Sequence, residues 1–153
     1  MDSITKNIEL NLSAEEAFGK FVNNFHEWWP KEYTWSLDTL EDISIASAVG
    51  GLCTEIGPNG FRVDWGTVID FQENKLLSFK WQIGPAREPV PDPGKASLVT
   101  VAFHSISDCE TDVELTHSDF KNHGDNYLEY LNAMDSKHGW SYLLNCYKEY
   151  AIT

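Results

Sequence analysis

The fold is decided by residues 65–81, which read WGTVIDFQENKLLSFKW. Apolar side chains recur at every second position in each half of this stretch, and the polar pair Glu73-Asn74 separates the halves. A period of two is typical of a strand with one buried face, and a short polar break between two such runs is typical of a hairpin. We therefore predict two antiparallel strands with these inward-facing residues: Trp65, Thr67, Ile69, Phe71, Leu77, Phe79, Trp81 and Ile83.

The same period continues on both sides of this hairpin, from Ile43 to His117. Upstream, an alternating run ends at the turn Pro58-Asn59-Gly60, and downstream two runs flank a turn at Ser107-Asp108. Their inward positions are predicted to be Leu52, Thr54, Ile56, Val99, Val101, Phe103, Val113, Leu115 and His117. These runs predict an antiparallel meander whose other face meets water through Arg62, Asp64, Asp70, Ser78, Lys80, Gln82, Asp112 and Glu114.

The segment before the meander combines a strand with short helices. Residues 4–12 alternate apolar and polar, and Ser13 followed by Glu16 forms a capping box at the start of a helix. This first helical region ends at Pro30, directly after Trp28 and Trp29. Its apolar stripe at helical spacing consists of Ala14, Ala17, Phe18, Phe21, Val22 and Phe25.

Helical spacing returns at the C-terminus. The helix could start near Tyr127 or near Ser136, and Gly139 permits a break. The order of elements predicts an α+β fold of the helix-grip type, with a curved antiparallel sheet of about six to seven strands around a long C-terminal helix and an apolar cavity between them. The stripe that such a sheet would grip consists of Trp140, Leu143, Leu144, Tyr147 and Ala151.

One stretch interrupts this pattern. Residues 84–94, GPAREPVPDPG, hold four of the six prolines of the chain. This proline-rich loop can be a long, stiff hairpin tip without a role. It can equally be a lid or a partner-contact loop at one end of the sheet, and the sequence leaves both interpretations open.

Composition restricts the classes of function. The net charge of −13 repels phosphate backbones and anionic membrane surfaces, so we expect no nucleic-acid and no membrane partner. The N-terminal residues lack the apolar core of a signal peptide, which predicts a cytoplasmic protein, and the length of 153 residues predicts one domain over residues 1–153. We expect Cys53, Cys109 and Cys146 to be reduced and buried, because they are odd in number and widely spaced.

The ordered elements resemble the START-like superfamily, also called SRPBCC. Within it, the chain resembles the group related to the C-terminal domain of activators of the heat-shock-protein-90 ATPase. The resemblance implies a helix-grip fold and a ligand cavity, but no particular activity. The stretches that carry it are LSAEEAF at residues 12–18, Trp28-Trp29-Pro30, Gly50-Gly51, Glu55, WGTV at 65–68, LSFKW at 77–81, TDVELTH at 111–117, and Gly139-Trp140.

Motifs for common enzymes are missing from the sequence: there is no phosphate-binding glycine loop and no G-x-S-x-G elbow. The polar cluster His117-Ser118-Asp119 and His123-Gly124-Asp125 matches no standard zinc spacing, so we predict a polar loop there, with no metal and no cofactor. His117 itself falls on the inward face, as a hydrogen-bonded core histidine or as a polar anchor in the cavity. Glu55 is expected to face water, unless a bulge after Gly50-Gly51 reverses the strand.

Aromatic residues make up 13% of the chain, with six Trp, which is more than packing of a small core requires. For any one ring, plain core packing is the simpler interpretation. Together the rings can line a pocket for a flat, mostly apolar molecule, although the acidic surface disfavours strongly anionic ligands at long range. The predicted ligand-binding residues are Trp28, Trp29, Trp65, Phe79, Trp81, Phe103, His117, Trp140 and Leu144.

Three functions remain open from the sequence. The first hypothesis is a protein that binds a small apolar, aromatic or lipid-like molecule, without catalysis. The second is an enzyme of the cyclase or dehydratase type, as some relatives of this fold are, with His117 and either Glu55 or a Tyr as acid–base pair. The third is a protein-binding module with a chaperone as partner. In each case we expect a monomer or a weak homodimer.

Overall fold

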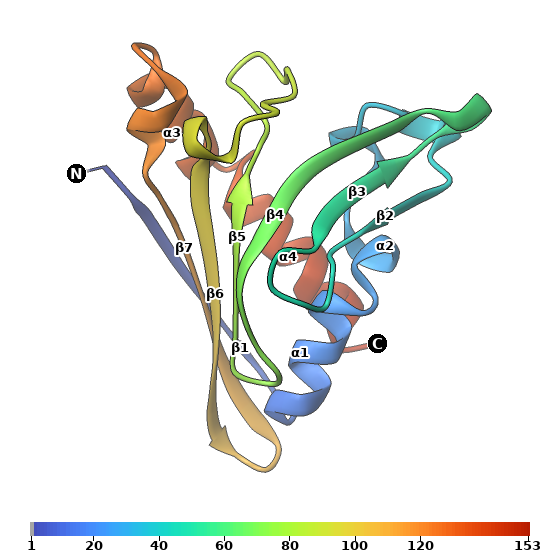
Figure 1. Ribbon diagram of the computed structural model, residues 1–153. Coiled ribbons are helices and arrows are strands. Elements are labelled where there is room, and N and C mark those ends of the chain that lie inside the picture. The colour runs from blue at the N-terminus through green and yellow to red at the C-terminus, as the bar shows by residue number, and fades with distance from the viewer. Residues whose placement is uncertain (1) are drawn as a thin grey trace.

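A seven-stranded antiparallel sheet curves around the C-terminal helix in the computed structural model, which describes residues 2–153 (Figure 1). The strands are hydrogen-bonded in the order β1-β7-β6-β5-β4-β3-β2. The predicted α+β helix-grip fold is confirmed. The strand bounds are β1 (Ile4–Leu10), β2 (Asp42–Ser44), β3 (Leu52–Ile56), β4 (Arg62–Gln72), β5 (Leu76–Trp81), β6 (Ser97–Ser107) and β7 (Glu110–Ser118).

Helices precede and follow the meander. Ser13 caps the first of them, because its Oγ accepts the backbone N–H of Glu16 at 3.1 Å. The α-helices are α1 (Ala14–Val22), α2 (Phe25–Trp28), α3 (Tyr127–Asp135) and α4 (Trp140–Ala151). The 3-10 helices are η1 (Lys31–Tyr33), η2 (Leu37–Thr39), η3 (Pro58–Gly60), η4 (Pro93–Lys95) and η5 (Phe120–His123).

The break between α3 and α4 falls at residues 136–139, where the sequence permits it. A Cβ atom at Gly139 would overlap the backbone of Met134, so only glycine allows the chain to turn this tightly. Downstream of the break, α4 lies across the concave side of the sheet (Figure 1). Its predicted stripe is confirmed, since Trp140, Leu143, Leu144, Tyr147 and Ala151 are all buried.

Two of the predicted strand faces are wrong. In β3, Cys53 and Glu55 point inward and Leu52 is 42% exposed, whereas Leu52, Thr54 and Ile56 had been expected inside. In β4, the pairing with β5 shifts between Val68 and Asp70, so Ile69 is 43% exposed. A bulge adds one residue to a strand and exchanges the faces of all residues beyond it.

Two polar residues of β5 and its extension are also buried, against the prediction of a water-facing surface. Ser78 hydrogen-bonds Thr100 across the strands at 2.8 Å. Gln82 donates to the carbonyl of Val90 at 2.9 Å and accepts from Thr67 at 2.6 Å. The proline-rich loop folds back over Gln82 and covers this part of the sheet, which explains its burial.

The cysteines differ from the expectation that all three are buried. Cys53 is buried, Cys146 is half-buried, and Cys109 is exposed in the turn between β6 and β7. Burial raises the pKa of the Cys53 thiol to about 12, so this side chain behaves as a small apolar group. Within residues 2–153, no helix combines the length and the hydropathy that crossing a bilayer requires.

Candidate functional site

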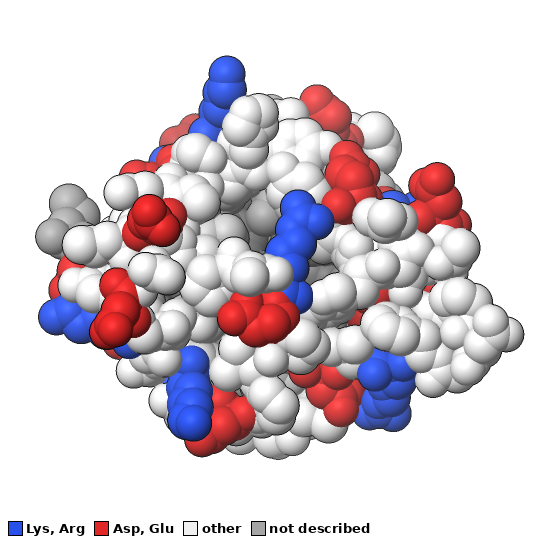
Figure 2. All heavy atoms as spheres, turned by 90° about the horizontal axis from the view of Figure 1, so that it is seen from above, with Lys and Arg blue, Asp and Glu red and all other residues white. Residues whose placement is uncertain are grey.

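A cavity of about 630 Å³ opens at the end of the sheet where β5 runs into the proline-rich loop. Figure 2 looks down on this face and shows a hollow near its centre. The walls come from five parts of the chain: the segment from Trp29 to Leu37, the end of β5, the proline-rich loop, α3 with the break that follows it, and Leu143 of α4. The cavity therefore lies at one end of the space between the sheet and α4.

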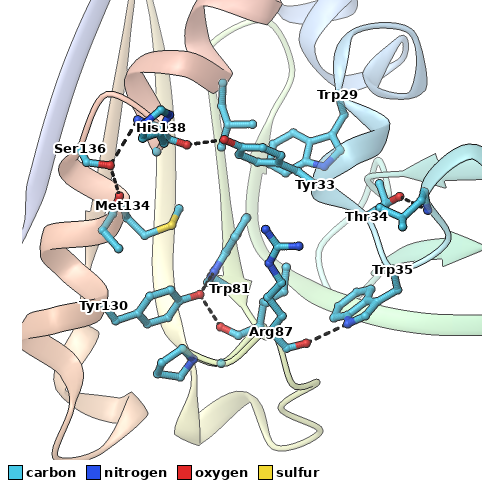
Figure 3. Close-up of a pocket in the computed structure, with 17 residues that line it drawn as sticks. Trp29, Tyr33, Thr34, Trp35, Trp81, Arg87, Tyr130, Met134, Ser136 and His138 are labelled. Atoms are coloured by element: carbon cyan, nitrogen blue, oxygen red, sulfur yellow. Dashed lines mark hydrogen bonds between the residues drawn. The ribbon is translucent and has the colours of Figure 1, made fainter.

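Two hydrogen bonds join opposite walls of the cavity (Figure 3). The phenol of Tyr33 donates to the carbonyl of His138 at 2.7 Å. The indole N–H of Trp35 donates to the carbonyl of Arg87 at 2.8 Å. These bonds connect the segment after α2 to the helix break on one side and to the proline-rich loop on the other, so the rim is held as a unit.

The deep end of the cavity is aromatic. Trp29 and Trp81 line it, with ring centroids 6.2 Å apart. The Trp81 indole N–H donates to the hydroxyl of Tyr130 at 2.6 Å, and that hydroxyl donates to the carbonyl of Ile83 at 2.6 Å. Burial raises the pKa of the Tyr130 phenol, which keeps it neutral at physiological pH. Because these polar atoms already have partners, the deep end presents an apolar surface to a guest molecule.

Glu55 anchors one wall from behind. Its side chain is fully buried and accepts three hydrogen bonds, from the backbone N–H of Trp35 at 3.2 Å, the backbone N–H of Ser36 at 2.8 Å, and the hydroxyl of Ser36 at 2.7 Å. The prediction that Glu55 faces water is wrong, since β3 turns Cys53 and Glu55 inward. Glu55 does not line the cavity, and its role is to position the segment that carries Trp35.

Two roles were open for His117, a hydrogen-bonded core histidine and a polar anchor in the cavity, and its contacts are those of the first. Its Nδ1 accepts the indole N–H of Trp140 at 2.9 Å, so the proton resides on Nε2, which donates to the hydroxyl of Ser97 at 2.7 Å. That hydroxyl then donates to Nε2 of His123 at 2.7 Å. Burial, and secondarily the neighbouring His123, holds the pKa of His117 well below its usual range. Burial also lowers the pKa of His123.

Of the nine predicted ligand-binding residues, Trp29 and Trp81 line the cavity. The other seven are packed in the core beneath it and do not contribute to its wall. Trp65 illustrates the reason, because it stacks on Phe25 at 5.4 Å and meets Phe79 edge-on at 5.7 Å, leaving no gap. The core residues concerned are Trp28, Trp65, Phe79, Phe103, His117, Trp140 and Leu144.

Sequence reasoning missed most of the actual wall. Tyr33, Trp35, Arg87, Tyr130 and Met134 lie in loops or on a short helix, where no strand or helix period marks a buried face. Two signals in the sequence did point here, namely the proline-rich loop and the permitted break at Gly139. Each of them marks a place where the chain leaves the sheet-and-helix pattern.

A metal site is not formed by the described residues: none of their His, Cys, Asp and Glu side chains gather in groups of three or more. The two histidines of the sequence cluster, His117 and His123, both hydrogen-bond the hydroxyl of Ser97. Asp119 instead occupies the left-handed backbone position before η5, with φ of 60°.

Comparison with models of protein families matches residues 12–151 to the family described as Activator of Hsp90 ATPase homolog 1-like protein. A comparison with curated proteins finds no match.

Three solved structures have the same fold over nearly the whole chain. One, described as "An anthrahydroquino-Gama-pyrone synthase Txn09 complexed with SUM", is 25% identical, with a TM-score of 0.67 and coverage of 97% of this chain and 96% of that one. The self-sacrificing resistance protein CalC from Micromonospora echinospora is 21% identical, with a TM-score of 0.68 and coverage of 98% and 94%. The Aha1 dimer from Colwellia psychrerythraea is 18% identical, with a TM-score of 0.64 and coverage of 99% and 97%.

Proposed function

We propose a ligand-binding function for this chain, which belongs to the family of Activator of Hsp90 ATPase homolog 1-like proteins. The ligand is a flat, mostly apolar small molecule, and its site is the cavity between β5, the proline-rich loop and the α3–α4 break. The observation that carries this proposal is the cavity itself, whose volume of about 630 Å³ falls in the range of small-molecule pockets.

The chemistry of the wall supports an aromatic guest. Trp29, Tyr33, Trp35, Trp81 and Tyr130 all contribute to it, and Met134 adds a flexible apolar side chain. Rings in such a wall can stack on a flat ligand or meet its edge. The hydrogen bonds across the rim keep these rings in place before a ligand arrives, which reduces the entropy lost on binding.

The geometry favours ligand binding over the second hypothesis, acid–base catalysis by His117 and a partner residue. His117 and Glu55 have partners within the protein, and neither lines the cavity. The similar synthase is described as complexed with SUM, which agrees with a guest in a fold of this kind. The proposal for this chain depends on its own cavity and not on the reaction of that protein.

A neutral fluorescent probe tests the proposal. N-phenyl-1-naphthylamine is flat and apolar, and its emission rises when it leaves water. We expect saturable binding with one probe per chain, measured by fluorescence titration and native mass spectrometry. The variant Ala133→Phe places a ring into the cavity from an exposed position on α3 and should abolish binding.

The matched control is Asn132→Phe, an equally exposed neighbour on α3 that does not line the cavity. This variant should bind the probe like the wild type. Absence of saturable binding to the wild type would refute the proposal. Equal probe affinity in the wild type and in Ala133→Phe, with both proteins folded, would show that the probe binds elsewhere and would also refute it.

A further inference from the structure

One cationic side chain lies at the cavity. Arg87, in the proline-rich loop, is the only Lys or Arg among the lining residues. Figure 3 shows its guanidinium reaching into the space between Trp35, Trp81 and Tyr33. In a protein with a net charge of −13, this basic residue lines an apolar pocket and is itself exposed, so its guanidinium can meet both water and a guest molecule.

Arg87 forms no salt bridge with any residue that the structure describes. The chain has two arginines, and the other, Arg62, pairs with Asp64 at 3.1 Å. The salt bridges formed among residues 2–153 do not include Arg87. Its five N–H donors therefore remain free for a guest.

Three carboxylates of neighbouring segments have other hydrogen-bond partners. Glu88, the next residue, accepts the backbone N–H of Ala86 at 2.8 Å. Glu55 accepts the backbone N–H of Ser36 at 2.8 Å, and Glu32 accepts a hydrogen bond from the hydroxyl of Tyr142 at 2.8 Å. None of these acids forms a salt bridge with Arg87.

The backbone holds Arg87 in this position. Its φ of 64° is left-handed, a conformation that side chains other than glycine and asparagine rarely adopt. Its N–H donates to the carbonyl of Gly84 at 2.9 Å, and its carbonyl accepts the indole N–H of Trp35 at 2.8 Å. A strained residue that persists because its neighbours fix it is typical of a functional position.

We infer that the ligand carries one anionic group, a carboxylate or sulfonate, that pairs with Arg87 while its ring system lies among the aromatic side chains. This inference rests on the proposed function and adds the chemical class of the ligand. A planar guanidinium can bind such a group through two parallel hydrogen bonds. The acidic surface slows the approach of an anion at long range, but salt screens that repulsion beyond a distance of about 10 Å, and the contact with Arg87 is local.

Two probes with one scaffold separate the two proposals. 8-Anilinonaphthalene-1-sulfonate is the N-phenyl-1-naphthylamine framework with a sulfonate added. We expect the substitution Arg87→Gln to weaken binding of the sulfonate probe about fivefold to tenfold more than binding of the neutral probe, as the loss of a charge-assisted contact predicts. Arg87→Lys keeps the positive charge but not the planar pair of donors. Its affinity for the sulfonate probe should lie between those of the wild type and Arg87→Gln.

The control is Arg62→Gln, which removes the same residue type and the same charge outside the cavity. It should leave the affinity for both probes as in the wild type. If the neutral probe binds and Arg87→Gln affects both probes equally, or neither, the inference about the anionic group is wrong while the binding function stands. If neither probe binds the wild type, the proposed function itself fails.

Discussion

Acidification should destabilise this protein through His117. The side chain is fully buried, and its Nδ1 accepts a hydrogen bond from Trp140, an arrangement that only the neutral ring can keep. Burial holds the pKa of His117 well below 6.5 in the folded state. The unfolded chain takes up a proton as the pH falls through about 6.5, whereas the folded chain does not. Protons therefore favour the unfolded state below that pH.

The size of the effect follows from this difference. Above a pH of about 7.5 both states are neutral at His117, and the free energy of unfolding does not depend on its protonation. Between a pH of about 7.5 and about 5.5, one histidine that stays neutral when folded lowers the free energy of unfolding by about 1.4 kcal/mol. The loss levels off once the pH reaches the lowered pKa of the folded state. His123 acts in the same direction but less, because it is partly exposed.

Urea unfolding at several pH values, followed by Trp fluorescence, measures this loss. The variant His117→Gln should be less stable at neutral pH and should lose about 1.4 kcal/mol less on acidification. His104→Gln, at an exposed position of β6, is the control and should keep the wild-type loss. The carboxylates titrate in all three proteins, so the comparison isolates His117.

Equal losses in the wild type and in His117→Gln would refute the reasoning. If that variant does not fold, the histidine ring signals of the wild type in NMR give a second measurement. The His117 signals should not shift between a pH of about 7.5 and about 5.5, because the folded ring stays neutral. A titration with a midpoint near 6.5 would contradict the burial argument.

Three further substitutions test other parts of the structure by urea unfolding. Glu55→Gln turns one acceptor oxygen into a donor that faces N–H groups, so it should cost about 1–3 kcal/mol and weaken probe binding; full stability would contradict the anchoring role. Trp140→Phe removes a hydrogen bond, whereas Trp65→Phe does not, because the Trp65 indole N–H has no partner among residues 2–153. Trp140→Phe should therefore be more destabilising by about 1 kcal/mol, and equal losses would contradict this. Gly139→Ala should destabilise the protein by more than about 1 kcal/mol, because its Cβ would overlap the backbone of Met134. Gly19→Ala in α1, where a Cβ meets no close atom, should instead stabilise it by about 0.5–1 kcal/mol. An unchanged stability of Gly139→Ala would show that the break can relax.

The architecture was predictable because it depends on periods. The alternation in residues 65–81 and the stripe from Trp140 to Ala151 each describe a surface that must be buried, whatever the neighbouring chain is. The errors in β3 and at Ile69 arise at shifts of strand register, which exchange the inward and outward faces. The alternation of residue types alone does not show these shifts. Glu55 was misplaced because the groups that satisfy its carboxylate belong to residues 35 and 36, and no local pattern shows that they come together.

The cavity was only partly predictable, for a related reason. Trp29 and Trp81 were named because they lie next to periodic elements. Trp35 and Arg87 belong to irregular segments, where the position of a side chain depends on hydrogen bonds formed after folding. The sequence could therefore predict a hollow between the sheet and the C-terminal helix, but not at which end of that space it lies or which of the many aromatic residues would leave room for it.

The four-residue interruption of the C-terminal helix has a consequence for how this fold can adapt to different guests. Trp140 packs among aromatic rings of the core and fixes α4. On the other side of the interruption, α3 is hydrogen-bonded to the end of β5 through the hydroxyl of Tyr130. A small rotation at the interruption would change the width of the hollow and shift the hydrogen bond from Trp81 to Tyr130, while α4 keeps its place against the sheet. Descendants of this chain could thus acquire larger or smaller guests by altering one joint, while the part that provides most of the folding free energy stays the same.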